Sequence, residues 1–487
     1  MRMNLSKETL ATVKTPGVVT PAAGIFSLPE KVLQFGTGVL LRGLPDYFID
    51  KANRQGIFNG RVVVVKSTDS GDAGAFDRQD GLYTLCVRGI EDGRKIEENI
   101  VCSAISRVLS ARDQWQDILE LAHQSQMQVI VSNTTEVGIQ LVEESIHGRT
   151  PVSFPGKLLA FLYERYKAFS GNAESGMIIV PTELIVDNGK KLAVIVKQLA
   201  AWNKLEEGFV NWLDQHCRFC SSLVDRIVPG KPDGATLQQL QHDLGYTDDL
   251  LAISEVYRLW AIEGDEKVRS VLSFAAADEG VIIAPDIEIY RELKLRLLNG
   301  THTLSCGLAV LAGFPTVKSA MDDATFSAFV ADLMLKEIAP NIPYAIPLAE
   351  ARDFGLKVLD RFRNPHIQHQ WISITMQYSS KIKMRIVPVL LKHYQPEPPP
   401  HIVLGFAAYL LFMRGQSGPV TDDKAAYFKD LWQKEPAEVV ATALKDQALW
   451  GADLSEIPGF EAAVRDNLDT LMNKGAATAL AQLTIKK

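Results

Sequence analysis

Four short apolar runs, rich in β-branched residues, mark the first 190 residues of the chain. They are KVLQF at 31–35, RVVVV at 61–65, MQVIVSN at 127–133 and MIIVPTELI at 177–185. An amphipathic stretch at 111–124 lies between the second and third runs. Continuous apolar strands that alternate with helices are typical of a mainly parallel sheet covered on both faces. We therefore predict an α/β, Rossmann-like, doubly wound domain in this part of the chain.

From about residue 190 the spacing of apolar residues becomes helical, at 190–202, 236–246 and 256–264. The run VIIAPDIEIY at 281–290 is expected to form a last strand and a connector. Beyond it the pattern is almost entirely helical, with breaks at 364–370 (NPHIQHQ) and 396–400 (PEPPP). The pattern predicts two domains, a Rossmann-like domain at 1–285 and a mainly α-helical domain at 286–487.

The charge balance and the apolar segments exclude several classes of protein. The 487 residues include 51 basic and 58 acidic side chains, for a net charge of −7, and no long basic stripe that would favour nucleic acid. The N-terminus lacks the apolar segment of a signal peptide. The longest apolar run, IVLGFAAYLLFM at 402–413, is far shorter than the roughly 20 residues of a membrane helix. We expect a cytoplasmic protein that binds neither nucleic acid nor membrane.

Five scattered cysteines, an odd number, indicate reduced thiols rather than a disulfide framework. Cys217 and Cys220 form one CxxC motif, and His216 stands beside it. A zinc site needs a second pair of cysteines or histidines at ligand spacing, and none follows in the sequence. We therefore predict partly buried thiols and no metal site.

A glycine turn follows the first apolar run, where a dinucleotide-binding fold has its first strand, turn and helix. Gly36 permits the tight turn, and Gly38 lets the backbone approach a pyrophosphate. Leu41 stands in place of the third glycine of GxGxxG, so the motif alone is weak evidence. Its position directly after a strand favours nucleotide binding by Gly36, Thr37 and Gly38.

Two charged residues after the second run, Lys66 and Asp69, bear on the choice between NAD and NADP. An acid that binds the ribose normally ends this strand, and Asp69 is a candidate one step removed, whereas Lys66 could attract a 2′-phosphate. Both could instead be solvated loop charges. We expect NAD, with Asp69 as a ligand.

The segment SNTTEVG at 132–138 follows the third run, at the carboxyl edge of the predicted sheet. Ligands bind at this edge in open α/β folds. Asn133 and Glu136 are therefore expected to line the nicotinamide pocket. A hydroxyl-rich turn that caps a helix is the alternative.

Three polar residues, Lys294, Asn299 and His302, interrupt the apolar segment LKLRLLNGTHTLS at 293–305. On an α-helix they fall within an arc of roughly 140°. Reduction of a ketone needs a hydride donor, a proton donor and stabilisation of the developing oxyanion. Lys294 could donate the proton, Asn299 could donate its amide N–H to the same oxygen, and His302 could hydrogen-bond the substrate.

The geometry of a straight helix also leaves a different interpretation open. It would place the Cα atoms of Lys294 and His302 about 12 Å apart, so that the two side chains meet only across a substrate. A surface lysine, a helix-breaking Asn299-Gly300 pair and a histidine with satisfied hydrogen bonds would give the same sequence.

The segment YRELKLRLLNGTH at 290–302 resembles the signature of the mannitol dehydrogenase family of long-chain, metal-independent polyol and sugar-acid dehydrogenases. Lys294, Asn299 and His302 match its lysine, asparagine and histidine without a gap. FGTGVLLRG resembles the family's G-x-G-x-x-x-R cofactor turn, so Arg42 joins the expected cofactor-binding residues. Further blocks follow in family order, and the resemblance runs from about residue 30 to about residue 480. It implies NAD-dependent hydride transfer with a lysine as general acid and base.

The block PTELI at 181–185 bears on the substrate. The polyol and fructuronate branches of the family carry S-C-D-N-L there, whereas the branch that reduces a keto-hexuronate, tagaturonate, carries P-C-E-L-I. With Thr182 in place of the cysteine, this chain resembles the latter branch. That implies NADH-dependent reduction of D-tagaturonate to D-altronate in galacturonate breakdown. A fructuronate reductase or a mannitol-type dehydrogenase is the alternative. A non-catalytic dinucleotide sensor is a remote one, because it should have lost Lys294 or Asn299.

A hexuronate carries a carboxylate, which a cation should receive. Lys381 matches the family's substrate lysine, and Arg363 is a second candidate in the same part of the chain. Lys383 and Arg385 also lie there, although a solvated charge run would explain them. Asp225 matches a family acid near the catalytic lysine, and we expect it to orient that lysine or to hold substrate hydroxyls.

Some positions depart from the polyol branch. Leu184 stands where that branch has a second oxyanion donor, and Asn188 is a candidate substitute that could equally be a turn residue. Arg291 stands where that branch has a glutamate, with Glu292 one step later, which puts a proton relay in doubt. Ser373 replaces an arginine. The resemblance fits a monomer or a homodimer.

Overall fold

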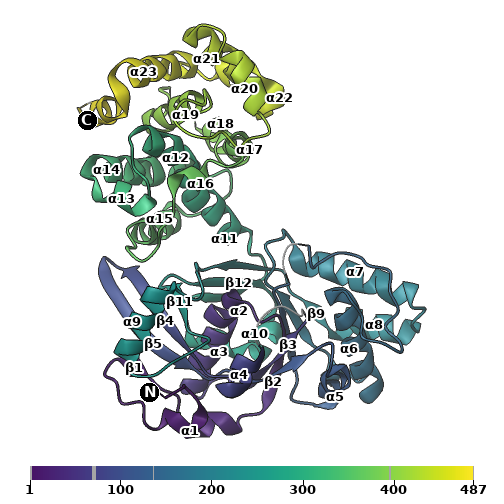
Figure 1. Cartoon of the computed structure of the whole chain (residues 1–487). Helices are drawn as coiled ribbons and strands as arrows, with labels where there is room; N and C mark the ends of the chain where they lie inside the picture. The colour runs from purple at the N-terminus through teal and green to yellow at the C-terminus, as the bar shows by residue number, and fades with distance from the viewer. Residues whose placement is uncertain (1–2, 68–72, 135–136, 394–395, 486–487) are drawn as a thin grey trace. The chain divides into compact units, whose positions relative to one another are not determined.

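The chain forms two compact units, shown in Figure 1. A computed structural model describes residues 3–67, 73–134, 137–393 and 396–485. The N-terminal unit holds residues 1–88 and 95–287, and the C-terminal unit holds residues 89–94 and 288–487. The first unit is α/β and the second is mainly helical, which confirms the predicted fold class. Within the described residues, no helix is long and apolar enough to cross a membrane.

A six-stranded sheet forms the centre of the N-terminal unit, with strand order β6-β3-β2-β7-β8-β9 and parallel pairing throughout. Each of the four predicted runs is confirmed to contain one of its strands, although the strand within 177–185 ends at Pro181. The six strands are β2 (Glu30–Phe35), β3 (Arg61–Lys66), β6 (Ile105–Ser110), β7 (Val129–Ser132), β8 (Ile178–Pro181) and β9 (Arg218–Phe219).

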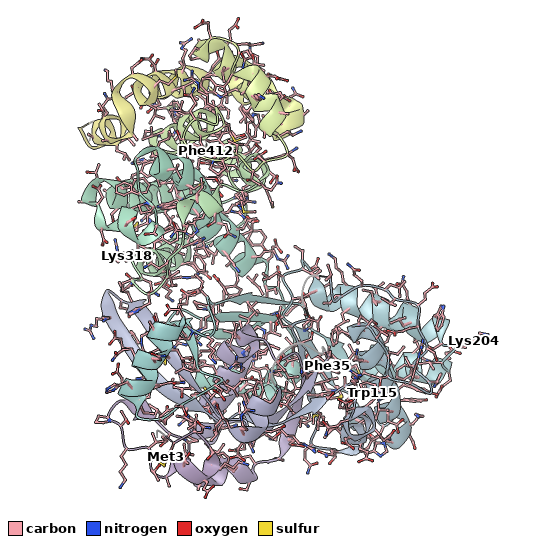
Figure 2. All side chains as sticks on the ribbon, viewed as in Figure 1. Met3, Phe35, Trp115, Lys204, Lys318 and Phe412 are labelled. Atoms are coloured by element: carbon pink, nitrogen blue, oxygen red, sulfur yellow. The ribbon has the colours of Figure 1, made fainter. Side chains whose placement is uncertain are left out.

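Both faces of this sheet are covered, and β3 shows why the sequence requires it. Val62 and Val64 pack into one apolar core, and Val63 and Val65 pack into a second core on the opposite face. Burial of each valine contributes about 1.5–3 kcal/mol. Figure 2 labels Phe35, which is fully buried in the second core. A run of valines is stable only in a strand covered on both sides, so the sheet is doubly wound.

Helices cover both faces of this sheet, whereas α1 and α9 pack in a third core with β4 and β5 (Figure 1). The second core is formed by the sheet together with α5 to α8, and α3 packs into the first core. The helices are α1 (Lys7–Leu10), α2 (Val39–Gly43), α3 (Pro45–Arg54), α4 (Ala73–Arg78), α5 (Trp115–Glu120), α6 (Phe154–Ala168), α7 (Asn188–Trp202), α8 (Glu207–His216), α9 (Gly234–Leu244) and α10 (Glu266–Val271).

Two smaller sheets complete this unit, with strand orders β1-β5-β4-β11 and β10-β12-β13. The predicted helix at 256–264 is wrong, because Leu259–Glu263 forms β12 between β10 and β13. Four successive buried residues, 259–262, suit a central strand covered on both faces. The strands are β1 (Val18–Val19), β4 (Tyr83–Glu91), β5 (Arg94–Cys102), β10 (Ser222–Asp225), β11 (Ala252–Glu255), β12 and β13 (Val281–Ala284).

The C-terminal unit is built around α19 (Pro400–Phe412), which is apolar on all sides and packs against α12 and α23. The buried carboxylate of Glu337 accepts the backbone N–H groups of His401 and Ile402, at 2.9 and 2.8 Å, and so caps this helix. The other helices are α11 (Glu288–Leu293), α12 (Thr301–Leu311), α13 (Val317–Asp322), α14 (Ala324–Asp332), α15 (Leu348–Phe362), α16 (Trp371–Ile374), α17 (Tyr378–Arg385), α18 (Val387–Lys392), α20 (Ala425–Leu431), α21 (Pro436–Lys445), α22 (Gln447–Trp450) and α23 (Phe460–Ile485), with π-helical segments η5 (Lys294–Gly300) and η6 (Leu333–Ile338).

All five cysteines are free and buried. Burial raises the pKa of Cys86 to about 11 and the pKa of Cys217, Cys220 and Cys306 to about 12. Burial also raises the pKa of Cys102 well above its ordinary value. These side chains are therefore protonated thiols at neutral pH.

Candidate active site

The glycine turn lies at the point where the strand order of the central sheet reverses. From β2 the chain proceeds to β3 and β6 on one side, and then returns to β7 on the other side of β2. In open α/β sheets this switch point is where ligands bind, outside the carboxyl ends of the strands. Residues 36–38 follow β2 directly and so occupy this position.

Gly36 and Gly38 contribute to the turn in different ways. Gly36 has a φ of +124°, and a Cβ there would lie 2.9 Å from the carbonyl oxygen of Asn133. Gly38 has a φ of −61°, and a Cβ there would meet open space. Gly36 is thus needed for the fold of the turn, whereas Gly38 leaves its backbone accessible. Such a turn fits the pyrophosphate of a dinucleotide.

Arg42 lies inside the fold rather than at the surface of the turn. Its guanidinium donates to the carbonyl of Leu250 and lies 5.7 and 5.4 Å from the ring centres of Phe76 and Tyr83. The side chain is buried. These contacts anchor the short helix α2, which ends at Gly43 because Leu44, the residue before Pro45, avoids the helical region. We propose that Arg42 supports the turn indirectly.

A buried acid, Asp46, lies at the base of the same turn. It accepts a hydrogen bond of 3.2 Å from Gln34, while Asp46 Oδ1 and Gln34 Oε1 have no partner among the described residues. Burial raises the pKa of Asp46 to about 7, against the opposing effects of the Gln34 hydrogen bond and of Arg42. A proton on Asp46 would turn one of these unpartnered oxygens into a donor.

The Asp46→Asn variant is expected to flatten the dependence of stability on pH. The pKa of Asp46 is raised in the folded state. Its contribution to the free energy of unfolding is therefore full below about pH 4 and is lost as the pH rises from there to about 7. Between pH 5 and 8 the free energy of unfolding of the parent protein should fall by about 2 to 3 kcal/mol, whereas that of the variant should not show this fall. Urea unfolding at both pH values measures this difference. Parallel pH profiles of the two proteins would contradict the assignment.

The segment after β7 is held against the glycine turn by the block at 181–185. The N–H of Asn133 donates to the carbonyl of Phe35 at 3.1 Å, and its side-chain amide donates to Thr182 Oγ1 at 2.9 Å. The buried carboxylate of Glu183 accepts the N–H and the hydroxyl of Thr134, both at 2.9 Å, and the hydroxyl of Ser132 at 3.1 Å. Thr182 and Glu183 therefore shape the edge of the expected nicotinamide pocket.

The Glu183→Gln variant is expected to weaken NADH binding about tenfold, because hydrogen bonds to a charged group contribute about 1.5–3 kcal/mol. Glutamine retains the size of the side chain but turns one acceptor oxygen into a donor that faces other donors. Fluorescence titration with NADH measures the affinity. The matched control is Glu174→Gln, at an exposed position of η3 (Ala173–Ser175), and this variant should bind NADH as the parent does. Equal affinity of both variants would show that residues 132–134 do not contribute.

Four other predicted residues of the N-terminal unit have different outcomes. Asn188 is fully buried, and among the described residues its amide binds only backbone groups, including the N–H and the carbonyl of Ser222 at 2.9 and 3.1 Å. This supports the turn interpretation, and we do not propose Asn188 as a substrate ligand. Asp225 is the buried last residue of β10, and its role stays a prediction. Asp69 and Glu136 lie outside the described residues.

In the C-terminal unit, Lys294, Asn299 and His302 lie on one continuous helical segment, 288–311, whose middle part is π-helical. Residues 294–300 form η5, and α12 continues from Thr301. A π turn bonds residues five apart, so Lys294 and Asn299 lie on the same face of the segment. The straight α-helix expected from the sequence would separate them by about 140°. Gly300 does not break the helix.

His302 is buried and neutral. Its ring stacks on Phe362 with centres 4.0 Å apart and planes 7° apart, and Trp371 meets it edge-on. Burial lowers the pKa of His302 well below its usual range, and the positive charge of His369, Arg361, Arg385 and Lys381 lowers it further. The Nε2 atom has no hydrogen-bond partner among the described residues. A buried nitrogen of this kind is suited to bind a polar ligand atom.

The charges around Lys294 are more balanced than the sequence alone indicates. Arg291 pairs with Glu288, and Arg296 pairs with Glu292 at 2.9 Å. The carboxylates of Glu288 and Glu292 therefore offset the positive charge that Arg291 and Arg296 would otherwise exert on Lys294. Since the carboxylate of Glu292 is engaged by Arg296, we propose no proton relay through this glutamate.

Of the two predicted carboxylate ligands, Lys381 is half-buried, and Arg363 is 42% exposed with Asp360 at 3.6 Å. Burial and then Arg385 lower the pKa of Lys381, whose Nζ donates to the carbonyl of Ile374 at 3.0 Å. The sequence interpretation missed Arg361, which is buried and whose positive charge lowers the pKa of His302. The sequence could have indicated it, because Arg361 lies three residues after the apolar Val358 and therefore on the same buried face of α15.

Comparison with known proteins agrees with the resemblance seen in the motifs. A family model described as the mannitol dehydrogenase Rossmann domain matches residues 30–273, and one described as the mannitol dehydrogenase C-terminal domain matches residues 286–472. The altronate oxidoreductase of Bacillus subtilis (strain 168) is 39% identical over 94% of this chain and 96% of its own length. That of Pectobacterium carotovorum subsp. carotovorum (strain PC1) is 37% identical over 93% of this chain and 96% of its own.

Solved structures resemble the chain in fold. The mannitol 2-dehydrogenase of Pseudomonas fluorescens, in a ternary complex with NAD and D-mannitol, has a TM-score of 0.68 and 23% identity over the full length of both chains. A substrate-free D-sorbitol dehydrogenase has a TM-score of 0.80 and 20% identity over 98% of this chain and 100% of its own.

Proposed function

Since this chain belongs to the mannitol dehydrogenase family, we propose that it reduces the keto-hexuronate D-tagaturonate to D-altronate with NADH. Relatives named altronate oxidoreductase match more than nine-tenths of the chain, which supports a sugar acid over a neutral polyol. The observation that carries the chemistry is the π turn, which puts Lys294 and Asn299 on one face of a helix.

The residues of this helix divide the proton chemistry between them. NADH, when bound, supplies the hydride. The ammonium of Lys294 donates a proton to the ketone oxygen as the C–O bond becomes single, and the resulting amine regains a proton from solvent. The amide N–H of Asn299 donates to the same oxygen and stabilises its developing charge. Neutral His302 binds a substrate oxygen through Nε2. The reverse reaction uses Lys294 as a base.

The substrate carboxylate is received by Lys381, next to Arg385. The pKa of Lys381 is lowered by burial and by that arginine, so a nearby carboxylate would restore a favourable environment for its charge. The positive charge of Lys381 also lowers the pKa of both His302 and His369, which supports a common role with the histidine that we propose binds the substrate. Arg363, which is more exposed and has Asp360 beside it, is less suited to this role.

The test of function follows NADH absorbance with tagaturonate, fructuronate and fructose, each repeated with NADPH. Tagaturonate with NADH should be preferred by at least about tenfold in kcat/KM, which corresponds to about 1.4 kcal/mol. A preference for fructuronate or fructose would contradict the substrate. A preference for NADPH would contradict the cofactor, and no turnover of any of the three substrates would contradict the function.

The Lys381→Met variant is expected to raise KM for tagaturonate by about 10- to 100-fold with little change in kcat, because it removes a charged hydrogen bond from bound carboxylate. Methionine keeps an unbranched apolar stem. Lys383→Met on the same helix is the control, since its side chain is exposed and contacts only the carbonyl of Ala448, at 3.4 Å, among the described groups. An equal rise in KM for a neutral ketose would show that Lys381 does not recognise the carboxylate.

A further inference from the structure

We propose that Arg296 and Arg385 are positioning residues for this reaction, because they hold the π turn of Lys294 and Asn299 against the helix that carries Lys381. The proposal rests on the proposed function. We call the two arginines and their partners Glu292, Thr303 and the carbonyls of 299, 384 and 385 the arginine clamp.

The first half of the clamp runs from the π turn to α17. The buried guanidinium of Arg296 binds the carboxylate of Glu292 through Nε and Nη2, at 2.9 and 3.2 Å. Its Nη1 donates to the carbonyls of Met384 and Arg385, at 2.6 and 3.0 Å. The last carbonyls of an α-helix have no partner within it. Arg296 therefore caps the C-terminus of α17 with a charge of the favourable sign.

The second half runs in the opposite direction, from α17 to the π turn. Arg385 Nη1 donates to Thr303 Oγ1 at 3.0 Å and to the carbonyl of Asn299 at 3.4 Å. The Thr303 hydroxyl donates to the same carbonyl at 2.7 Å. These bonds satisfy a carbonyl close to where the backbone changes from π-helical to α-helical bonding. The clamp thus stabilises the end of the π turn.

A glycine lets the two elements approach closely. A Cβ at Gly300 would lie 3.3 Å from Ile386 Cδ1, just beyond the end of α17, and 3.9 Å from the carbonyl oxygen of Arg385. Little space therefore separates the π turn from the end of α17. The clamp bonds involve Arg296, before Gly300 in the sequence, and Thr303, after it. A shift of the π turn or of α17 would therefore stretch hydrogen bonds made by charged groups.

The clamp matters for the proposed reaction because the ammonium of Lys294 and the amide of Asn299 must both reach the ketone oxygen. If the π turn relaxed to α-helical bonding, Asn299 would rotate by roughly 140° from Lys294 and its amide would leave the ketone oxygen. A displacement of about 1 Å can already lower a rate about 10²-fold. The clamp should therefore affect kcat with any ketone, whereas a carboxylate ligand would affect KM with a uronate alone.

The test compares Arg296→Met, Arg385→Met, the double variant, Arg385→Lys and the control Lys383→Met. Each is assayed with tagaturonate and with a neutral ketose, NADH affinity is titrated, and hydrogen exchange is measured for amides 294–303. Both single methionine variants should lose about 10- to 100-fold in kcat with both substrates, with NADH affinity unchanged. Exchange at 294–303 should rise, the double variant should resemble the singles, and Arg385→Lys should recover part of the rate.

Three results would overturn the clamp. A rise in KM for tagaturonate alone, with kcat unchanged, would make Arg385 a carboxylate ligand instead. Unchanged exchange at 294–303 would show that the π turn does not depend on these bonds. Additive losses in the double variant would show two independent roles. If the parent protein turns over no keto-hexuronate, the proposed function fails, and the exchange measurement still tests the clamp by itself.

Discussion

Replacement of Lys294 by alanine is expected to lower kcat about 10³-fold, in the range that a positioned general acid contributes. Lys294 begins the π turn, and Asn299, five residues later, lies on the same face. Without the ammonium, water must supply the proton to the ketone oxygen. The loss should be equal in both directions of the reaction, because the same group acts as acid in one and as base in the other.

The affinity for NADH separates this loss from misfolding. Lys294 lies in the C-terminal unit and the glycine turn in the N-terminal unit, so Lys294→Ala should bind NADH as the parent does. Lys294→Arg provides a second comparison, since arginine keeps the charge but does not release its proton near neutral pH. Near-normal kcat in either variant would show that Lys294 is not the proton donor.

The second large effect is expected at the glycine turn, where Gly36→Ala should raise the dissociation constant of NADH at least about tenfold. An alanine at a φ of +124° costs about 1–3 kcal/mol, and its Cβ would also lie 2.9 Å from the carbonyl oxygen of Asn133. The turn and the segment after β7 would have to separate. Thermal unfolding should occur at a lower temperature in this variant.

Gly38→Ala is the matched comparison for Gly36→Ala. The backbone of Gly38 already has a φ that alanine adopts, and its Cβ would meet open space, so the melting temperature should not change. NADH affinity should nevertheless fall, because the methyl group would occupy the approach to the pyrophosphate. If Gly38→Ala bound NADH normally, the dinucleotide would not approach the backbone at this residue.

The central sheet could be predicted because its strands are buried on both faces. The valines of β3 fit a doubly wound sheet, and their alternation between two cores follows from the geometry of a strand. The sequence predicts a helix where β12 lies, because the apolar and polar residues at 256–264 also fit helical spacing. Only its position between β10 and β13 distinguishes the two.

The candidate site could be predicted as a set of residues but not as a geometry. The spacing of Lys294, Asn299 and His302 is visible in the sequence, whereas the π turn is not, and neither are the bonds that its end receives from α17, more than 80 residues later. The burial of Arg42 and Asn188 depends on distant backbone carbonyls in the same way. Local pattern identifies candidate residues for the chemistry, and tertiary hydrogen bonds decide where each side chain points.

The five buried thiols allow local opening to be measured separately within each of the two units. A thiol with a raised pKa behind packed side chains reacts with iodoacetamide only when the surrounding structure opens. Cys306 is the thiol of the C-terminal unit, and Cys86, Cys102, Cys217 and Cys220 belong to the N-terminal unit. Alkylation rates at single cysteines, resolved by mass spectrometry, would therefore yield an opening free energy for each unit of the unmodified protein. A ligand of the glycine turn should slow the four reactions of its own unit.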